Sequence, residues 1–206
     1  MNIAIIGSGN VGLALAKGLG KTSHNVYLGV RDQQSAKAIH AKQVLGNVPV
    51  LAISDACKNA EVIIITTPAD SVVALIPYLG NVSGKVIIDA TNSIRTKPEP
   101  YQTAFHAMVG LTTNAEIVKC FNSTGFENMT NPIYNDMGLD MFCAGNSLKA
   151  KQVAIQLSKE IGFENCYDFG GDDKVELLEK FALSWINLAI MQGLGRNIAF
   201  KVIKRN

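Results

Sequence analysis

The first twelve residues constrain the fold of this chain more than any other stretch. Residues 2–6 form an apolar run rich in β-branched side chains, which predicts a short strand. The run stops at Gly7-Ser8-Gly9-Asn10-Val11-Gly12, and residues 13–19 then follow a helical period. A strand that turns through the pattern G-x-G-x-x-G into a helix is the fingerprint of a dinucleotide-binding unit. We therefore expect residues 7–11 to contact a pyrophosphate.

Each glycine of this turn has its own expected role. Gly7 permits a tight turn, Gly9 lets the backbone approach the phosphates, and Gly12 lets the helix pack against the strand. The free N–H groups and the positive dipole end of the helix then face the anion. A tight turn without a ligand is the alternative interpretation, and the position of the turn between a strand and a helix argues against it.

The composition is that of an ordinary folded protein. Of the 206 residues, 48% are hydrophobic and 17% are charged, which excludes a disordered chain. The formal net charge of +2 gives no reason to expect nucleic-acid binding. The apolar runs fall short of the roughly 18 residues that a membrane-spanning helix needs, and the N-terminus lacks the basic leader of a signal peptide. We therefore expect a cytoplasmic protein that binds neither nucleic acid nor membrane.

The cysteine and histidine residues show no spacing typical of a metal site. The 4 cysteines and 3 histidines lie far apart, without a CxxC pair. Cys120 and Cys143 fall inside apolar runs, so we interpret them as reduced thiols of the core. The sequence thus predicts a protein without a bound metal.

The end of the second expected strand decides which nucleotide fits. Residues 25–30 form this strand, which ends at Val30-Arg31-Asp32. In NAD-binding proteins an acidic side chain here takes the ribose hydroxyls, whereas in NADP-binding proteins an arginine meets the 2′-phosphate. We interpret Arg31 as the phosphate ligand and Asp32 as the N-cap of the next helix, which favours NADP(H). Because Asp32 also lies close to the spacing of an NAD carboxylate, NAD remains the alternative.

Three further apolar runs, at residues 61–65, 85–90 and 115–121, predict buried strands of a parallel sheet. Small polar residues follow each run. In a doubly wound sheet, ligands bind beyond the carboxyl ends of the strands, so these residues are expected beside the cofactor. Plain turns and polar loops are the alternative. The predicted crevice residues are Thr66, Thr67, Pro68, Ala90, Thr91, Asn92 and Asn122, the last with an amide that can bond a carboxamide or an acceptor ring.

The second half of the chain shows a smaller set of elements. Residues 125–135 are polar and rich in turn formers, and we interpret them as a lid. Strands are expected at residues 139–144 and 164–169, with an amphipathic helix at residues 147–161 between them. Residues 172–200 carry the longest helical pattern, whose apolar stripe indicates either core or a dimer interface.

These elements predict an α/β fold, namely a Rossmann doubly wound parallel sheet with a small C-terminal α/β extension and a long last helix. We expect residues 1–121 to form an NADP-binding Rossmann domain. Residues 122–206 are expected to form a smaller part, packed on that domain, which contributes to acceptor binding and dimerisation.

The whole chain resembles a compact family of NADP oxidoreductases related to the archaeal reductase of the deazaflavin coenzyme F-420. It is also similar to the cytosolic domain of the six-transmembrane metalloreductases. The resemblance rests on five stretches, of which the last two are the most specific: Ile5–Gly12, Gly29–Asp32, Thr66–Asp70, Val118–Met129 and Trp185–Arg196.

The resemblance implies a set of roles. Residues 8–11 would hold the pyrophosphate, Arg31 the 2′-phosphate, and Thr67 and Pro68 the nicotinamide side, and the protein would be a homodimer through its last helix. Two positions depart from the family pattern. Asn122 stands where the deazaflavin reductases have a histidine near the deazaflavin, and Ser35 stands where they have a lysine on the 2′-phosphate. The first departure concerns the acceptor, and the second weakens the expected preference for NADP.

Three functions remain open from the sequence. The first is an NADPH-dependent oxidoreductase that exchanges hydride with a small-molecule acceptor, a flavin or deazaflavin, with Asn122, Gly193 and Leu194 on the acceptor side and no identified catalytic residue. The second is a reductase or dehydrogenase of a small carbonyl, imine or hydroxy acid, with Lys180 as the acid, although Ser184 stands where such enzymes have an asparagine. The third is an NADP-binding redox sensor without turnover.

Overall fold

The computed structural model, which describes residues 1–205, contains one eight-stranded sheet and one two-stranded hairpin. The spatial order in the large sheet is β3-β2-β1-β4-β5-β6-β9-β10. Its strands are β1 (Asn2–Ile6), β2 (Asn25–Val30), β3 (Val50–Ala52), β4 (Val62–Ile65), β5 (Val86–Asp89), β6 (Glu116–Cys120), β9 (Asp140–Ala144) and β10 (Asn165–Asp168). The hairpin consists of β7 (Ile133–Tyr134) and β8 (Met137–Gly138).

The first six strands have the order 3-2-1-4-5-6 and all run parallel, which is the Rossmann arrangement. The order reverses between β1 and β4, so the crevice of a doubly wound sheet opens between the ends of these two strands. Strand β9 pairs with β6 in the antiparallel direction, and β10 pairs with β9 in parallel. The predicted fold class is therefore confirmed, with the C-terminal strands extending the same sheet.

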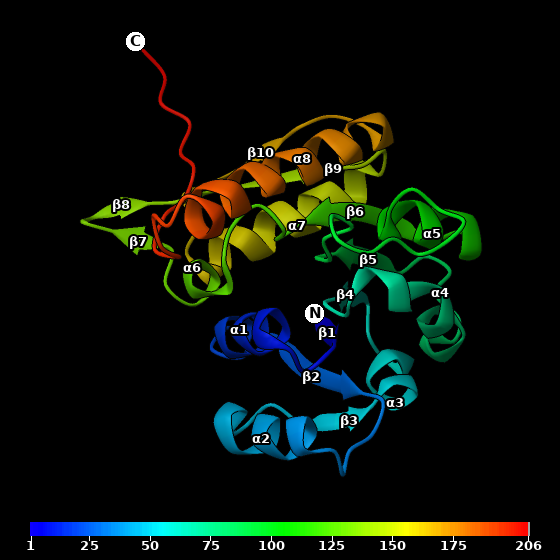
Figure 1. Cartoon of the computed structure of the whole chain (residues 1–206). Helices are drawn as coiled ribbons and strands as arrows, with labels where there is room; N and C mark the ends of the chain where they lie inside the picture. The colour runs from blue at the N-terminus through cyan, green and yellow to red at the C-terminus, as the bar shows by residue number, and fades with distance from the viewer. Residues whose placement is uncertain (206) are drawn as a thin grey trace.

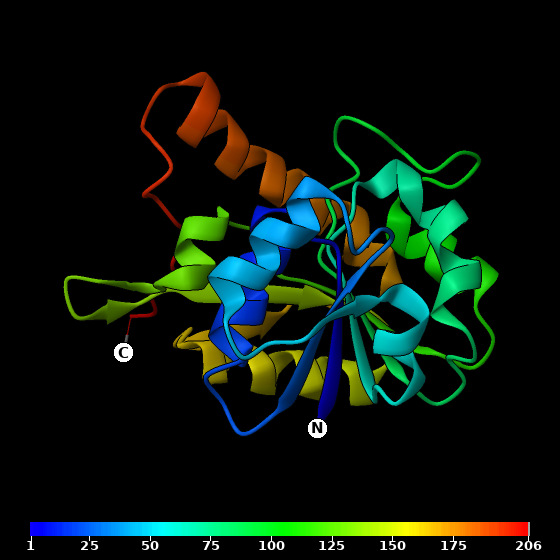
Figure 2. The ribbon, with the colours of Figure 1, turned by 90° about the horizontal axis from the view of Figure 1, so that it is seen from below.

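Helices cover both faces of the sheet (Figures 1 and 2). On one face lie α1 (Asn10–Leu19), α2 (Ala36–Leu45) and α7 (Leu148–Ile161), with the short α6 (Phe126–Thr130) beside α1. On the other lie α3 (Ile53–Lys58), α4 (Val72–Leu75) between two 3₁₀ turns, α5 (Ala104–Leu111) and α8 (Val175–Ile186). The 3₁₀ turns are η1 (Ala69–Ser71), η2 (Ile76–Leu79) and, before α8, η3 (Asp172–Lys174), and α8 continues into a π-helical turn, η4 (Asn187–Met191).

The core follows from the alternation of side chains along the strands. In β1, Ile3 and Ile5 belong to the cluster on the α1 face, whereas Ala4 and Ile6 belong to the cluster on the α8 face. All four residues of β4 are buried, as are all four of β5. Continuous apolar runs are required here because a parallel sheet is covered on both faces.

The C-terminal part differs from the sequence-based expectation at two places. Residues 125–135 are not turns throughout, because residues 126–130 form α6, which buries Met129 against the core beside α1, and the role of this segment as a lid stays a prediction. The last helical pattern was expected to run to residue 200, but it ends at Met191, where Gln192 begins an irregular tail that contains Gly193 and Gly195 at positive φ. The long last helix itself is confirmed.

The apolar stripe of the last helix is mainly core. Leu178, Trp185 and Ala189 are buried, whereas Leu177 is 53% exposed. Strand β9 joins the sheet of the first six strands directly through β6, so the boundary expected at residue 121 falls inside one continuous sheet and stays a prediction. None of the helices in residues 1–205 has the length and apolar character needed to cross a bilayer.

Candidate functional site

The glycine-rich turn brings β1 and α1 into very close contact. Gly7 has φ +121°, and a Cβ at this residue would lie 2.8 Å from Thr66 Oγ1. A Cβ at Gly12 would lie only 1.9 Å from the carbonyl oxygen of Gly7. Thr66, the first residue after β4, donates its hydroxyl to the carbonyl oxygens of Ile6 (2.9 Å) and Gly7 (3.2 Å). The turn is thus fixed by β4 as well as by its own glycines.

Gly9, in contrast, faces open space. It occupies the N-cap position of α1, makes no side-chain cap, and a Cβ built on it would meet nothing within 4 Å. Ser8 is half-buried and Asn10 is exposed, so the N-terminal N–H groups of a ten-residue helix are accessible beside a residue without a side chain. This cradle fits a pyrophosphate, which needs close backbone approach and free N–H donors.

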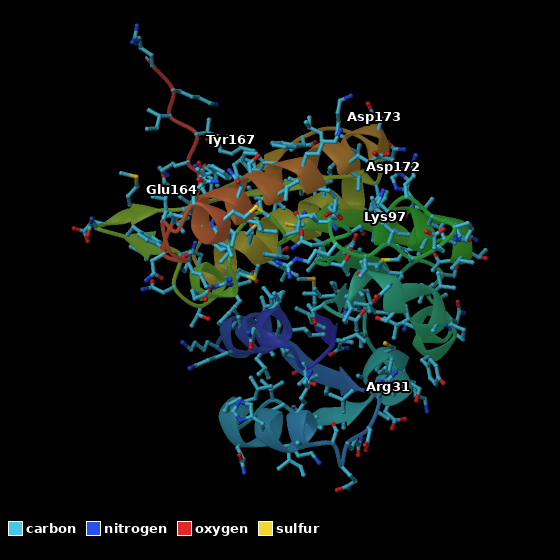
Figure 3. All side chains as sticks on the ribbon, viewed as in Figure 1. Arg31, Lys97, Glu164, Tyr167, Asp172 and Asp173 are labelled. Carbon is cyan, nitrogen blue, oxygen red and sulfur yellow. The ribbon has the colours of Figure 1, made fainter. Side chains whose placement is uncertain are left out.

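The end of β2 presents a free guanidinium. Arg31, labelled in Figure 3, is exposed. Within residues 1–205 its side chain makes no ion pair or hydrogen bond. Asp32 was expected to cap α2, but Ser35 does so by accepting a hydrogen bond from the N–H of Ala38 at 3.3 Å. Asp32 instead accepts from the N–H of Gln34 at 2.8 Å in the turn before the helix. One carboxylate oxygen of Asp32 is therefore engaged locally, whereas Arg31 remains available.

Three buried polar atoms at the ends of successive strands lack a hydrogen-bond partner among the described residues: Thr67 Oγ1, Thr91 Oγ1 and Asn122 Oδ1. They follow β4, β5 and β6, whose carboxyl ends lie at one edge of the sheet. The Asn122 side chain donates to Asn92 Oδ1 at 3.3 Å, which ties the loop after β6 to the loop after β5. Buried polar atoms normally find partners, so this row of atoms fits polar ligands such as a nicotinamide with its ribose and, at Asn122, an acceptor ring.

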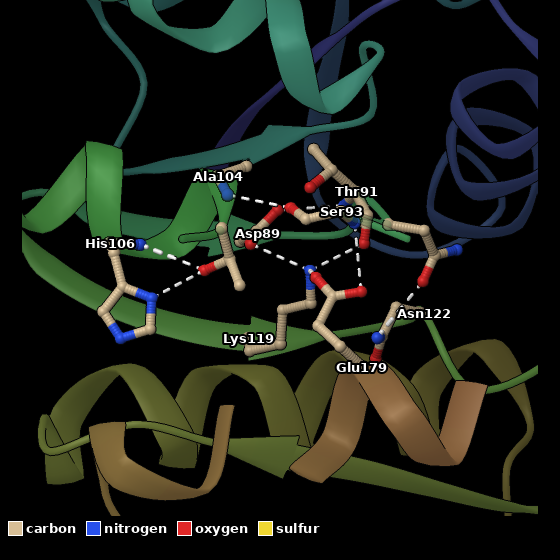
Figure 4. A network of polar contacts seen from close by, with 10 residues as sticks. Asp89, Thr91, Ser93, Ala104, His106, Lys119, Asn122 and Glu179 are labelled. Carbon is tan, nitrogen blue, oxygen red and sulfur yellow. Dashed lines mark hydrogen bonds and ion pairs between the residues drawn. The ribbon is translucent and has the colours of Figure 1, made fainter. Parts of the chain in front are cut away.

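Beside these atoms lies a buried ionic network that sequence analysis missed (Figure 4). Asp89 and Lys119 are register partners on β5 and β6, and Lys119 Nζ lies 2.9 Å from Asp89 Oδ2. The same ammonium donates to Glu179 Oε1 of α8 and to the carbonyl oxygen of Thr91, both at 2.6 Å. All three N–H groups of the ammonium are thus used, and its side chain is fully buried.

The network also holds the loop after β5. Asp89 Oδ1 accepts from the N–H of Thr91 at 2.9 Å, and Glu179 Oε2 accepts from the N–H of Ser93 at 3.0 Å. Burial alone lowers the pKa of Lys119, but the two carboxylates outweigh it and raise that pKa above its ordinary value. Burial raises the pKa of Glu179 despite the opposing effect of Lys119. The loop is therefore fixed by charge–charge contacts from three different elements.

A signal for part of this network was present in the sequence. Asp89 and Lys119 each interrupt an apolar strand run at its carboxyl end, and single charged residues in buried strands are rarely left unpaired. No comparable signal marks Glu179, because a glutamate on an amphipathic helix is usually exposed.

The residues expected on the acceptor side are not all brought together. Gly193 and Leu194 lie in an exposed turn after η4, and within residues 1–205 no hydrogen bond connects this turn with Asn122. The tail that follows is anchored elsewhere. Arg196 pairs with Glu127 of α6, and the carbonyl oxygen of Ile198 accepts from Trp185 Nε1 at 2.6 Å.

Two cavities adjoin the sheet. One, of about 150 Å³, lies beside the network and is lined by Ser93, Lys97, Glu176, Glu179 and Lys180 among others. The other, of about 400 Å³, is lined by Glu116 at the start of β6 and therefore lies at the edge opposite the glycine turn. Among residues 1–205 no group of three or more histidine, cysteine or acidic side chains is placed to hold a metal ion. All 4 cysteines are free, and burial raises the pKa of Cys57 to about 11.

Comparisons with known proteins agree with this geometry. Residues 2–93 match the family described as NADP oxidoreductase, coenzyme F420-dependent. The chain is 26% identical over 212 residues to the F420-dependent NADP reductase of Methanocaldococcus jannaschii, an alignment that covers 92% of this chain and 93% of the relative.

Solved structures give the same result. A crystal structure from Arthrobacter sp. FB24, provisionally named an F420 dependent NADP-reductase, has a TM-score of 0.86 and 25% identity over 99% of this chain and 100% of that chain. A reductive aminase from Aspergillus terreus shares the fold alone, with a TM-score of 0.66 and 18% identity over 93% of this chain and 63% of that chain. The chain is therefore an NADP-dependent oxidoreductase, and it is similar to coenzyme F420-dependent NADP reductases over most of its length.

Proposed function

We propose that this enzyme transfers hydride between NADPH and a planar acceptor of the flavin or deazaflavin class. The observation that carries the proposal is the row of unpartnered atoms, Thr67 Oγ1, Thr91 Oγ1 and Asn122 Oδ1, along the edge of the sheet that also bears the open cradle at Gly9. The row ends at the carboxamide of Asn122 rather than at an acid or a base. Hydride transfer to a ring beside the nicotinamide requires neither, so this ending agrees with a planar acceptor. The relative from Methanocaldococcus jannaschii is named as an F420-dependent reductase, which supports this acceptor class.

The proposed cofactor site follows the edge of the sheet from β2 to β6. Residues 7–11 hold the pyrophosphate through backbone N–H groups, since Gly9 leaves them open. Val30, Arg31 and Ser35 border the adenosine end, where the guanidinium of Arg31 binds the 2′-phosphate. The nicotinamide end is lined by the segments that follow β4 and β5, namely Thr66, Thr67, Pro68, Ala90, Thr91 and Asn92.

Little acid–base chemistry is required of the protein in this reaction. NADPH supplies the hydride, and transfer between two stacked rings depends on their distance and alignment. The residues of this chain therefore bind, orient and exclude water. Asn122 contributes its amide on the acceptor side, with Gly193 and Leu194 as further proposed contacts that would have to approach from the exposed turn after η4.

Reduction of a small carbonyl or imine, or oxidation of a small hydroxy acid, through Lys180 is not favoured. Lys180 is exposed, and Ser184, one turn further along α8, bonds back to the Lys180 carbonyl oxygen at 3.1 Å. The pair therefore does not present an acid and a positioning amide to a substrate.

We also propose that two copies of the chain associate through the end of the last helix. Ile190, Met191 and Leu194 are 46%, 62% and 61% exposed and lie close together in the sequence. Three large apolar side chains in one exposed stretch are typical of an interface.

The experiment that tests the function is NADPH oxidation at saturating nucleotide with three acceptor groups: a deazaflavin, free FMN or FAD, and a panel of carbonyls and imines. Turnover with a deazaflavin or flavin supports the proposal. Turnover confined to carbonyls or imines overturns it, and so does tight NADPH binding without turnover, which would identify a sensor. The variant Asn122→Leu should lower kcat/KM for the acceptor about tenfold and leave the Kd of NADPH within about twofold.

A further inference from the structure

At formal charges, the buried network of Asp89, Lys119 and Glu179 contains two negative groups and one positive group. Two carboxylates share one ammonium, and every side chain of the three is at most 7% exposed. Burial of ionic groups is costly, and an excess charge costs more than a matched pair. Well-packed apolar side chains would stabilise a fold at least as well, so stability alone does not account for the network.

The charged groups of the network bond directly to the segment 91–93. Lys119 Nζ and Asp89 Oδ1 bond the carbonyl oxygen and the N–H of Thr91, the same residue whose hydroxyl lacks a partner. Glu179 bonds the N–H of Ser93 two residues further on. The charge therefore lies directly behind the segment 91–93, which forms the wall of the proposed nicotinamide site (Figure 4).

Other charged side chains near the network are poorly placed to cancel the excess. Lys97 and Lys180 line the 150 Å³ cavity that Glu179 also lines, but both are exposed and neither is ion-paired among the described residues. Solvent screens such exposed charges much more strongly than buried ones. Glu176, which lines the same cavity, adds a further negative charge at the surface.

We propose that the negative charge of this network makes the site bind the oxidised, positively charged nicotinamide more tightly than the reduced, neutral one. The inference rests on the proposed function, because it assumes that the segment 91–93 borders the nicotinamide. When hydride leaves the ring with its electron pair, the ring gains one positive charge and the acceptor is reduced. A fixed negative charge behind the wall stabilises that product ring and so favours hydride transfer out of NADPH.

The test compares the dissociation constants of NADP⁺ and NADPH, measured separately by calorimetry at pH 8, for the wild type and for Glu179→Gln. The substitution preserves the shape of the side chain and removes one negative charge. We expect the Kd of NADP⁺ to rise about tenfold relative to the Kd of NADPH, because the removed charge would act on the ring through a protein interior of low effective dielectric constant. Glu176→Gln is the matched control, because it removes the same charge from an exposed position one turn away on α8 and should leave the ratio unchanged.

A purely structural role predicts a different result, namely that both dissociation constants rise together and their ratio stays at the wild-type value. That outcome overturns the proposal, as does an equal change of the ratio in Glu176→Gln. If Glu179→Gln unfolds below the temperature of the titration, Asp89→Asn removes the same charge from the other side of Lys119, and the same criterion applies. Failure of the wild type to bind either nucleotide would refute the proposed function instead.

Discussion

Gly12 and Gly7 lie so close together that a single methyl group on Gly12 would be 1.9 Å from the Gly7 carbonyl oxygen. Gly9, two residues after Gly7, differs, because a Cβ added to it would have nothing within 4 Å. The motif G-x-G-x-x-G therefore contains glycines of two kinds. Gly12 must be a glycine for α1 to pack against the turn, whereas the position of a Cβ at Gly9 is not occupied by any other part of the chain.

This difference predicts opposite results for two identical substitutions. Gly12→Ala should lower the free energy of unfolding by at least about 2 kcal/mol, because the contact is with backbone that cannot move aside. Gly9→Ala should lower the free energy of unfolding by no more than about 1 kcal/mol, the cost of alanine at an N-cap. It should weaken NADPH binding at least about tenfold, because its methyl group enters the phosphate cradle. Urea unfolding and calorimetric titration measure the two effects. Unchanged NADPH affinity in Gly9→Ala would contradict the assignment of the cradle.

Arg31 is expected to determine the preference for the phosphorylated nucleotide. Arg31→Ala should weaken NADPH binding about ten- to hundredfold, the size of a charge-assisted contact, and should change NADH binding by less than about threefold. Arg205→Ala removes a guanidinium from the exposed end of the chain and serves as the control. Calorimetric titration with both nucleotides gives the comparison. Equal losses for NADPH and NADH would show that Arg31 does not contact the 2′-phosphate.

Removal of the buried ammonium should be strongly destabilising. Lys119→Met leaves Asp89 and Glu179 facing each other without a cation, and breaking a buried ionic group in this way costs about 3–5 kcal/mol of unfolding free energy. Lys97→Met deletes an exposed lysine and should change the free energy by no more than about 0.5 kcal/mol. The measurement is urea unfolding of both variants. A loss below about 1 kcal/mol in Lys119→Met would mean that Lys119 does not bear the charge described here.

The sheet could be predicted from the sequence because its strands are nearly continuous apolar runs. Residues 62–65 and 86–88 are apolar and buried on both faces of the sheet, and such runs are typical of the strands of a parallel sheet. The segments proposed to border the cofactor could be placed at the carboxyl ends of the strands for a related reason, since they directly follow these runs.

Other features depend on contacts between distant parts of the chain. Asp32 and Ser35 are both good N-cap residues, and the choice of Ser35 depends on where the turn after β2 ends. Residues 126–130 are polar enough to look like a loop, and they form α6 because Met129 packs beside α1 more than one hundred residues earlier in the chain. Glu179 lies 60 residues from Lys119, and local periodicity contains no information about such a pairing.

Because β9 pairs with β6 in the antiparallel direction, the loops that follow the strands open at two opposite edges of the sheet, here called the first and the second rim. Loops that follow β1 to β6 open on one rim, whereas those that follow β9 and β10, around Gly145 and Gly170, open on the other and bond to each other at 3.0 Å. Affinity handles, fluorophores or surface tethers attached at the second rim would lie at the edge of the sheet opposite the proposed nucleotide site. Immobilisation through that rim would therefore leave the proposed nucleotide site free.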